Sequence, residues 1–178
     1  MALDAPTSSG PPAAYFPNPG DSIVVGIIDV GTYQQRDYDS GELKTWPDGG
    51  KVEGKVVTGL VVSTSGAMAG TDKAHQPISA GDIVTFWCEG GKHYTWRDAL
   101  KAHGPVNVGD VMLWKREDDE PAKNPRHNPR KVYSARIRSA EGKDGDIVER
   151  CTEANRANRE RITVDAPEPA YTASSEPF

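Results

Sequence analysis

Residues 22 to 34 read SIVVGIIDVGTYQ, a segment rich in β-branched side chains that predicts one long β-strand. Gly26 and Gly31 fall inside it, and a glycine within a strand is typical of a bulge or a sharp bend. A Gly-Asp pair precedes this segment and two later apolar segments. Because Gly adopts positive φ and Asp bonds nearby backbone, each pair predicts a turn that begins a strand. The pairs are Gly20-Asp21, Gly81-Asp82 and Gly109-Asp110. A long, bent first strand favours a small closed barrel.

Four more strands are predicted on either side of one short helix. The segments that predict them are residues 55–64, 83–88, 111–116 and 131–138, and residues 63–80 are predicted to be a loop. The helix is predicted to begin at Thr95, with Asp98 as a capping partner, and to end at Gly104. Three strands, a short helix and two strands form the element order of the OB-fold, which binds oligonucleotides on strands two and three and on two loops. We therefore predict a mainly β fold: a five-stranded OB-fold barrel with one short helix between strands 3 and 4, and disordered termini.

The chain length allows one domain with tails. Of the 178 residues 36% are hydrophobic, which suffices for one modest core. We predict a disordered N-terminal arm at residues 1–19, an OB-fold nucleic-acid-binding domain at 20–140, and a polar segment at 141–178. The last segment is predicted to be partly helical and then to form a disordered acidic tail, because it has no Lys or Arg after Thr163.

Several classes of protein are disfavoured by composition. The first residues have neither a basic start nor a long apolar run, so we expect a soluble protein that is not exported and has no membrane partner. Cys88 and Cys151 lie far apart without a CxxC pair, which argues against a disulfide framework or a zinc site and fits a reducing cytoplasm. The histidines form no recognisable catalytic spacing, and no Gly-rich phosphate loop opens a helix. We expect no enzyme activity, no cofactor and no metal.

The distribution of charge matters more than its sum. A net charge of −5 disfavours nucleic-acid binding at first, because Lys and Arg supply most non-specific affinity for phosphate. Cations and carboxylates balance between Gly20 and Ala140, however, and most of the excess negative charge lies from Glu141 onward. Six cations in the balanced part follow one another without a carboxylate: Lys123, Arg126, Arg130, Lys131, Arg136 and Arg138. This stripe is either a DNA-binding surface or an ordinary solvated face.

Binding of single strands requires flat side chains on which bases stack and cations along the backbone path. The polar, Gly-rich connection from Asp37 to Gly50 is predicted to be the first long loop. This loop and its flanks supply both kinds of residue: Tyr33, Arg36, Tyr38, Lys44, Trp46, Lys51 and Lys55. Trp46 is the strongest candidate because it lies in a polar turn with no evident core to fill. The alternative is a loop anchor folded back on the barrel.

The other aromatic residues are assigned by strand alternation. Trp87 alternates with Phe86 and Cys88, which are better suited to the interior, so Trp87 is predicted to face outward. Trp114 is predicted to be core, and Tyr94 and Trp96 are assigned to packing. The second long loop is predicted at Glu117 to Arg130. Phosphate contacts are expected there and at the first residue of the next strand, from Lys123, Arg126, Arg130 and Lys131. The acidic run from Glu117 to Glu120 either points away from these cations or competes for them.

One segment of the chain resembles a known family. The first-loop sequence from Gln34 to Gly49, QQRDYDSGELKTWPDG, looks like that of small OB-fold single-stranded DNA-binding proteins encoded by phages and prophages of actinobacteria. The helix from Trp96 to Gly104 and the segment from Asn128 to Tyr133 are similar as well. The resemblance spans roughly residues 20–140 and implies a role in phage DNA replication or recombination, in the cytoplasm of a bacterial host. Residues 63–80 lack the acidic segment expected of that family.

The last residues, Glu176, Pro177 and Phe178, resemble the acidic, Pro-Phe-terminated tails of bacterial single-stranded DNA-binding proteins. Such an end can place a ring in a partner's apolar pocket and a carboxylate on a basic rim. We therefore expect a protein that binds single-stranded DNA and recruits replication or recombination proteins through its tail. A homo-oligomer is one assembly that the sequence leaves open. The alternative is a phage structural or assembly protein that uses the same barrel for protein contacts.

Overall fold

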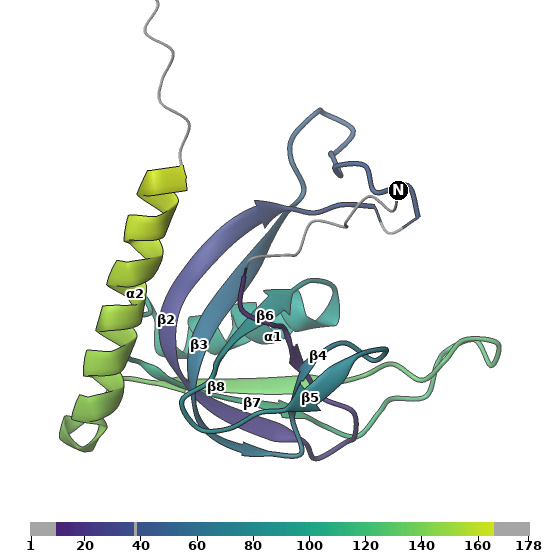
Figure 1. The fold of residues 1–178 in the computed structure, drawn as a ribbon. Coiled ribbons are helices and arrows are strands. Elements are labelled where there is room, and N and C mark those ends of the chain that lie inside the picture. The colour runs from purple at the N-terminus through teal and green to yellow at the C-terminus, as the bar shows by residue number, and fades with distance from the viewer. Residues whose placement is uncertain (1–9, 38, 166–178) are drawn as a thin grey trace, which may run out of the picture.

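The computed structural model describes residues 10–37 and 39–165, with side chains as far as Arg161 (Figure 1). The strands are β1 (Ala14–Tyr15), β2 (Ser22–Gln34), β3 (Glu53–Ser65), β4 (Met68–Gly70), β5 (His75–Pro77), β6 (Ile83–Cys88), β7 (Val111–Arg116) and β8 (Tyr133–Arg138). The helices are α1 (Gly91–His103), a 3-10 turn (Gly142–Asp144) and α2 (Gly145–Asp165). The prediction of a mainly β fold is confirmed.

The strands form two antiparallel sheets. Five of them make one sheet in the order β6-β3-β2-β7-β8, and β1-β4-β5 make a small second sheet. The five-stranded sheet curves strongly but does not close, because β6 and β8 are its two edges and do not pair with each other. The prediction of a closed five-stranded barrel is therefore wrong at this seam. The loop predicted at residues 63–80 is also wrong in part, since it contains β4 and β5.

The seam between the edges is occupied by other segments. Helix α1 lies along the β8 edge, where the Thr95 hydroxyl donates to the Tyr133 carbonyl at 3.1 Å. The N-terminal segment lies along the β6 edge, where the Thr85 N–H donates to the Pro12 carbonyl at 2.9 Å. The β8 edge is thus contacted by a helix and the β6 edge by the N-terminal segment, which forms an isolated parallel bridge from Ala13 to Thr85. Such contacts protect sheet edges from pairing with another chain.

Residues 10–19, assigned above to a disordered arm, are packed in the structure. The Phe16 ring is 2% exposed and meets the Tyr133 ring edge to face at 5.8 Å. Arg116 donates from Nη1 to the carbonyls of Phe16 and Pro17 at 2.9 and 2.6 Å. The burial of Phe16 and these bonds to a buried guanidinium offset the entropy of ordering the segment. Residues 1–9 lie outside the described residues.

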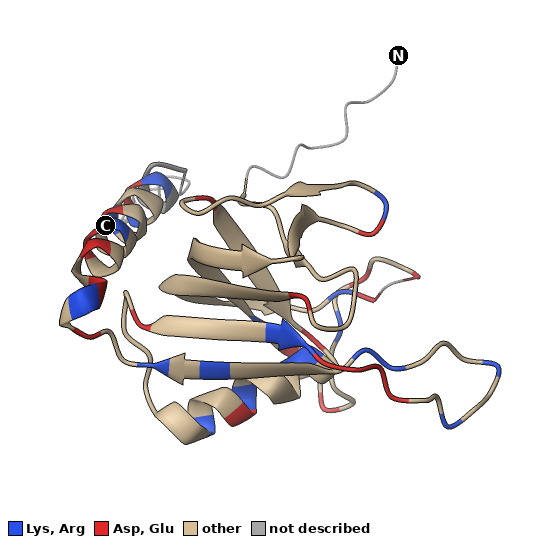
Figure 2. Ribbon diagram, turned by 90° about the horizontal axis from the view of Figure 1, so that it is seen from below, with Lys and Arg blue, Asp and Glu red and all other residues tan. Residues whose placement is uncertain are grey.

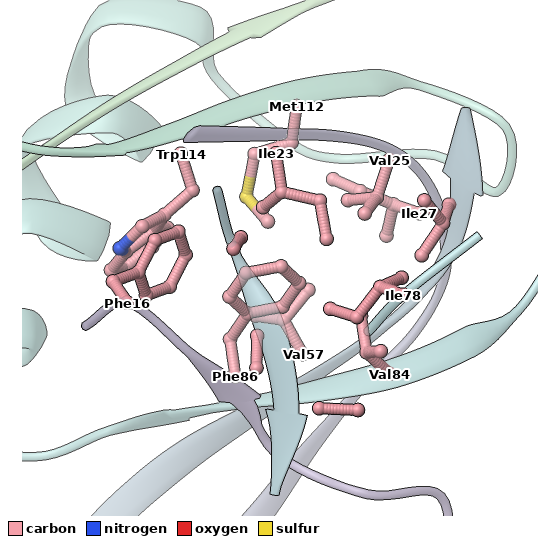
Figure 3. Close-up of a cluster of buried hydrophobic side chains, with 14 of the residues drawn as sticks. Phe16, Ile23, Val25, Ile27, Val57, Ile78, Val84, Phe86, Met112 and Trp114 are labelled. Atoms are coloured by element: carbon pink, nitrogen blue, oxygen red, sulfur yellow. The ribbon is translucent and has the colours of Figure 1, made fainter. Parts of the chain in front are cut away.

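The main core lies inside the curve of the five-stranded sheet. Figure 3 shows Phe16, Ile23, Val25, Phe86, Met112 and Trp114 converging there. Trp114 is fully buried, as predicted. In β2 the register shifts between Val24 and Val25 and again between Ile27 and Asp29, on either side of Gly26. These irregularities, near the predicted bulge, allow one strand to bend around the core.

Helix α1 begins at Gly91, four residues before the predicted start. Thr95 therefore lies inside the helix, and its hydroxyl bonds to Tyr133 instead of capping the helix. The helix ends before Gly104, which has a φ of 94° as the predicted C-terminal glycine. Helix α2 covers one end of the outer face of the sheet, where Cys151 is buried against Ile28 and Leu60.

Candidate nucleic-acid interface

Two aromatic rings lie together on the outer face of the sheet. Tyr33 is opposite Gly54 in the β2–β3 register, and Trp87 is opposite Val56 in the β3–β6 register. The rings of Tyr33 and Trp87 meet edge to face with centroids 4.7 Å apart. Trp87 is 46% exposed, so it faces outward as predicted. We call Tyr33, Trp87, Gly54 and Val56 the aromatic platform.

Tyr33 is fixed in the platform by its neighbours. A Cβ on Gly54 would lie 2.6 Å from the Tyr33 hydroxyl oxygen, so only glycine lets the ring lie this close to β3. The Tyr33 hydroxyl donates a hydrogen bond to the Glu89 carboxylate. Burial, and then this bond to Glu89, raise the pKa of Tyr33 well above its ordinary value. The hydroxyl therefore remains a donor, and the ring is held while the Trp87 face stays open to solvent.

Lys55 is not part of this platform. It is opposite Thr32 in β2 and Cys88 in β6, and Cys88 is fully buried. Since side chains alternate along a strand, Lys55 points to the face opposite that of Gly54 and Val56. Its ammonium donates to the Thr32 hydroxyl at 2.6 Å. The structure thus separates Lys55 from two residues with which it was grouped by sequence.

The first long loop, residues 35–52, is an ordered ribbon. Isolated bridges join Arg36 to Leu43 and Thr45 to Lys51. At its turn, the Trp46 N–H donates to the Gly50 carbonyl at 2.7 Å. Trp46 is 57% exposed, which favours a binding residue over an anchor packed on the sheet. Lys44 and Lys51 are exposed in the same ribbon, and Tyr38 lies outside the described residues.

This ribbon is not basic overall. Its cations are accompanied by Asp37, Asp39, Glu42 and Asp48. The backbone N–H groups of Ser40 and Asp39 bond to Asp37 and lower the pKa of its carboxyl, so it is ionised. Arg36 donates to the Gly41 carbonyl at 3.0 Å and so braces the turn. The ribbon is therefore better suited to contact a ligand through the Trp46 ring than to attract it through positive charge.

The second long loop extends the β7–β8 hairpin, and its acidic run competes for cations. Glu120 binds Arg130 at 2.6 Å, and Asp119 binds Arg116 at 2.8 Å. Glu117 accepts from the Ser134 hydroxyl at 2.5 Å. Among the described residues, the remaining cations of this loop make no ion pair within 4.0 Å. They are Lys123, Arg126 and Lys131.

A groove of about 750 Å³ runs between α1 and β8. Tyr94 and Thr95 of α1 line one side, and Lys131, Ser134 and Arg136 line the other. Tyr94 is 58% exposed, so its assignment to packing was wrong: Trp96 takes the buried position and leaves Tyr94 on the open side of the helix. We call this feature the α1–β8 groove. The sequence does not predict this groove, because α1 and β8 meet only in the tertiary structure.

The two long loops both project on the side of the molecule away from α2 (Figures 1 and 2). Figure 2 also shows the mixture of Lys, Arg, Asp and Glu along the β7–β8 loop. The structure brings Tyr33 and Trp87 together, but it does not place them in contact with Trp46 or Lys55. Glu176, Pro177 and Phe178 lie outside the described residues.

Within residues 10–37 and 39–165 no three His, Cys, Asp or Glu side chains are grouped so as to hold a metal ion. None of the helices in this part of the chain is both long and apolar enough to span a membrane. Comparisons with protein-family models, curated proteins and solved structures found no match.

Proposed function

We propose that this protein binds single-stranded DNA without strong sequence preference, through the aromatic platform and the exposed side chains of the two long loops. The observation that carries the proposal is the Tyr33–Trp87 pair. The two rings lie on an exposed part of the sheet and are not among the buried residues of the core. A base stacked on an aromatic side chain contributes about 1–3 kcal/mol and requires no particular base identity.

The arrangement of the strands supports an OB-like architecture. Counted along the chain, the five strands of the large sheet stand in the order 3-2-1-4-5, with α1 between the third and the fourth. In an OB-fold the face of strands two and three and the loops after strands one and four bind oligonucleotides. Gly54 and Val56 of the platform lie on β3 and Trp87 lies on β6, which are the corresponding strands two and three, while Tyr33 comes from the end of the first strand, β2. Both long loops follow the corresponding strands.

The charge distribution supports a binding mode in which stacking outweighs phosphate neutralisation. Arg130 is already paired with Glu120, and the cations of the first long loop are accompanied by four carboxylates. Only a few phosphates can then be neutralised. With about four to six phosphate contacts, the log–log salt slope on single strands is expected to be about −3 to −4.

The test is fluorescence anisotropy of a labelled oligo-dT titrated with the full chain at two salt concentrations, beside a duplex of equal length. Tight, salt-sensitive binding of the single strand, with much weaker binding of the duplex, is expected. Absence of binding, or binding that does not respond to salt, would refute the proposal. In that case the exposed aromatics become candidates for protein contacts, as in a phage structural or assembly protein that co-purifies with virions.

The biological setting belongs to the same proposal. A role in phage DNA replication or recombination in the cytoplasm of a bacterial host would use the body of the protein to hold DNA. The tail residues Glu176, Pro177 and Phe178 would then recruit partner proteins. Loss of partner capture on deletion of Pro177 and Phe178, with DNA binding unchanged, is the result expected.

A further inference from the structure

The α1–β8 groove carries positive charge that the protein itself does not neutralise. Lys131 and Arg136 both line it, and neither forms an ion pair within 4.0 Å among the described residues. The Glu117 carboxylate is close enough to feel Arg136, but its bonds go to the Ser134 hydroxyl and the Lys115 ammonium. Asp98, on the opposite wall, is paired with Arg97. The groove therefore retains two cations for an anionic ligand.

The groove also contains an exposed aromatic ring. Tyr94 projects from α1 at 58% exposure, and the Arg97 guanidinium lies 5.0 Å from its ring centroid. His93 meets the same ring edge to face at 5.7 Å. The guanidinium lies over the ring, and these contacts hold it in place while more than half of the side chain stays exposed. A fixed, exposed ring beside free cations is the combination that takes a base and its phosphate.

The groove and the aromatic platform meet at one turn. Glu89 accepts a bond from Tyr33 of the platform, and Gly91, two residues later, lines the groove. Gly90 lies between β6 and α1 and Gly91 begins α1, and a Cβ on either would meet nothing within 4 Å. The space beside both glycines is therefore open to a strand that leaves the platform past the Glu89 carboxylate.

A peptide is a poorer occupant than a nucleic-acid strand. Extended peptides dock most often by adding main-chain hydrogen bonds to an open sheet edge. Here α1 covers the β8 edge: Thr95 donates to the Tyr133 carbonyl at 3.1 Å, and His103 lies 3.3 Å from the Ser139 hydroxyl. The groups left for a ligand are side chains, two cations and a ring.

We propose that the α1–β8 groove is a second binding track for the same nucleic-acid strand. In this proposal Lys131 and Arg136 contact phosphates, and Tyr94 stacks a base beyond those held by the platform. The inference rests on the proposed function and extends it: the footprint covers the platform, the turn at Gly90-Gly91 and the groove. Short strands occupy the platform alone, and longer strands reach the groove.

The test uses the double variant Lys131→Gln/Arg136→Gln in the full chain. Its matched control is Lys101→Gln/Arg156→Gln, which removes two exposed cations elsewhere, one of them on α1 itself. Labelled oligo-dT strands of about 6 to about 24 nucleotides span the site sizes of OB-type proteins. Affinity is measured for each length at several salt concentrations. Circular dichroism and urea unfolding establish that each variant is folded.

Wild type and control are expected to gain affinity with length beyond the shortest strands that bind. The groove variant is expected to lose about tenfold on the long strands and clearly less on the short ones, where only Lys131 of the second long loop can contribute, and to show a salt slope on the long strands smaller by about 1.4. Tyr94→Ala is expected to lose the same length-dependent gain with an unchanged slope.

Different failures are distinguishable. If wild type binds no single strand of any length, both the proposed function and the second track are refuted. If wild type binds but the groove variant retains the full length dependence and slope, the second track is refuted and the proposed function stands. If instead the variant keeps its oligonucleotide affinity and loses binding of a poly-glutamate peptide that wild type captures, the groove is a site for acidic peptides.

Discussion

The outer face of the five-stranded sheet has one end that is covered by α2 and one end that is exposed to solvent. At one end Leu60 is 4% exposed beneath α2, and at the other Trp87 of the neighbouring strand β6 is 46% exposed. The same period-2 alternation sends both side chains outward. Outward apolar residues on the same face of the sheet therefore take different roles, depending on which segment lies over them. A covered end contributes stability, and an open end is available for a ligand.

The covered end depends on the absence of a side chain at Gly26. A Cβ there would collide with Ile147 of α2 and lie 2.7 Å from the Cys151 sulfur. We expect Gly26→Val to destabilise the protein by about 3 kcal/mol, because overpacking forces α2 away from the sheet. Urea unfolding measures this loss. Gly142→Ala, at a site with nothing within 4 Å, is the control and should change stability by less than about 0.5 kcal/mol. An unchanged unfolding midpoint in Gly26→Val would mean that α2 does not cover this end in solution.

The open end should show the reverse pattern. We expect Trp87→Ala to weaken binding of oligo-dT by about 1–3 kcal/mol, since it removes a stacking surface. That corresponds to roughly a five- to 160-fold increase in Kd. The cost to stability should be no more than about 1 kcal/mol, from the lost edge-to-face contact with Tyr33. Anisotropy and urea unfolding measure the two effects, with Val108→Ala as an exposed apolar control. A large loss of stability with unchanged binding would make Trp87 a structural residue.

The start of α2 should respond to pH through Asp144. Its carboxylate takes a bidentate pair of bonds from Arg138 at 2.6 and 3.0 Å and one from the Glu141 N–H at 2.8 Å. The bond from Arg138, followed by that from Glu141, lowers the pKa of Asp144. Because the folded pKa is below the unfolded value, the stabilisation is present above about pH 3.9 and is lost as pH falls through the lowered pKa.

Asp144→Asn should therefore unfold at lower urea concentration than wild type at pH 7, and the difference should shrink as pH falls below about 3.9. Asp98→Asn breaks an exposed pair with Arg97 and serves as the control, with little effect at either pH. A gap between wild type and Asp144→Asn that stays constant with pH would show that the charge of Asp144 does not anchor α2.

The smallest expected effect concerns the charge beside the platform. Glu89 accepts the Tyr33 hydroxyl bond, and its negative charge opposes a phosphate at the open end. For a phosphate about 6 Å away in a water-like dielectric, the repulsion is about 0.7 kcal/mol. Glu89→Gln should then tighten binding of oligo-dT about threefold at low salt and less at high salt, measured by anisotropy. Weaker binding in this variant would mean that Glu89 acts mainly by holding the Tyr33 ring.

Several elements could be predicted from the chain alone because their signals are local. Strands β2, β6 and β7 have the predicted bounds, since β-branched alternation and the Gly-Asp turns act over a few residues. The outward position of Trp87 follows from the same alternation. The start of α1 was missed because Gly91 to Tyr94 have no sequence cap, and Thr95, which looks like a cap, bonds to Tyr133 instead.

The parts that were missed depend on partners distant in the sequence. Phe16 orders the N-terminal segment only because Tyr133 and Arg116 lie where it can reach them. The sequence allows the acidic run from Glu117 to Glu120 either to point away from the nearby cations or to compete for them. The ion pair between Glu120 and Arg130 shows that it competes. Tyr94 is exposed because the face of α1 toward β8 is taken by Thr95 and Trp96.

The sequence by itself determined a mainly β protein with a long bent first strand, two long polar loops and aromatic residues at the ends of strands. Only the tertiary structure decided that the sheet stays open between β6 and β8, that α2 covers one end of its outer face, and that Tyr33 meets Trp87 over Gly54. The physical reason is the separation along the chain over which each kind of interaction acts. Propensity and periodicity act between neighbours along the chain, whereas the exposure of a side chain depends on whichever distant segment comes to lie against it.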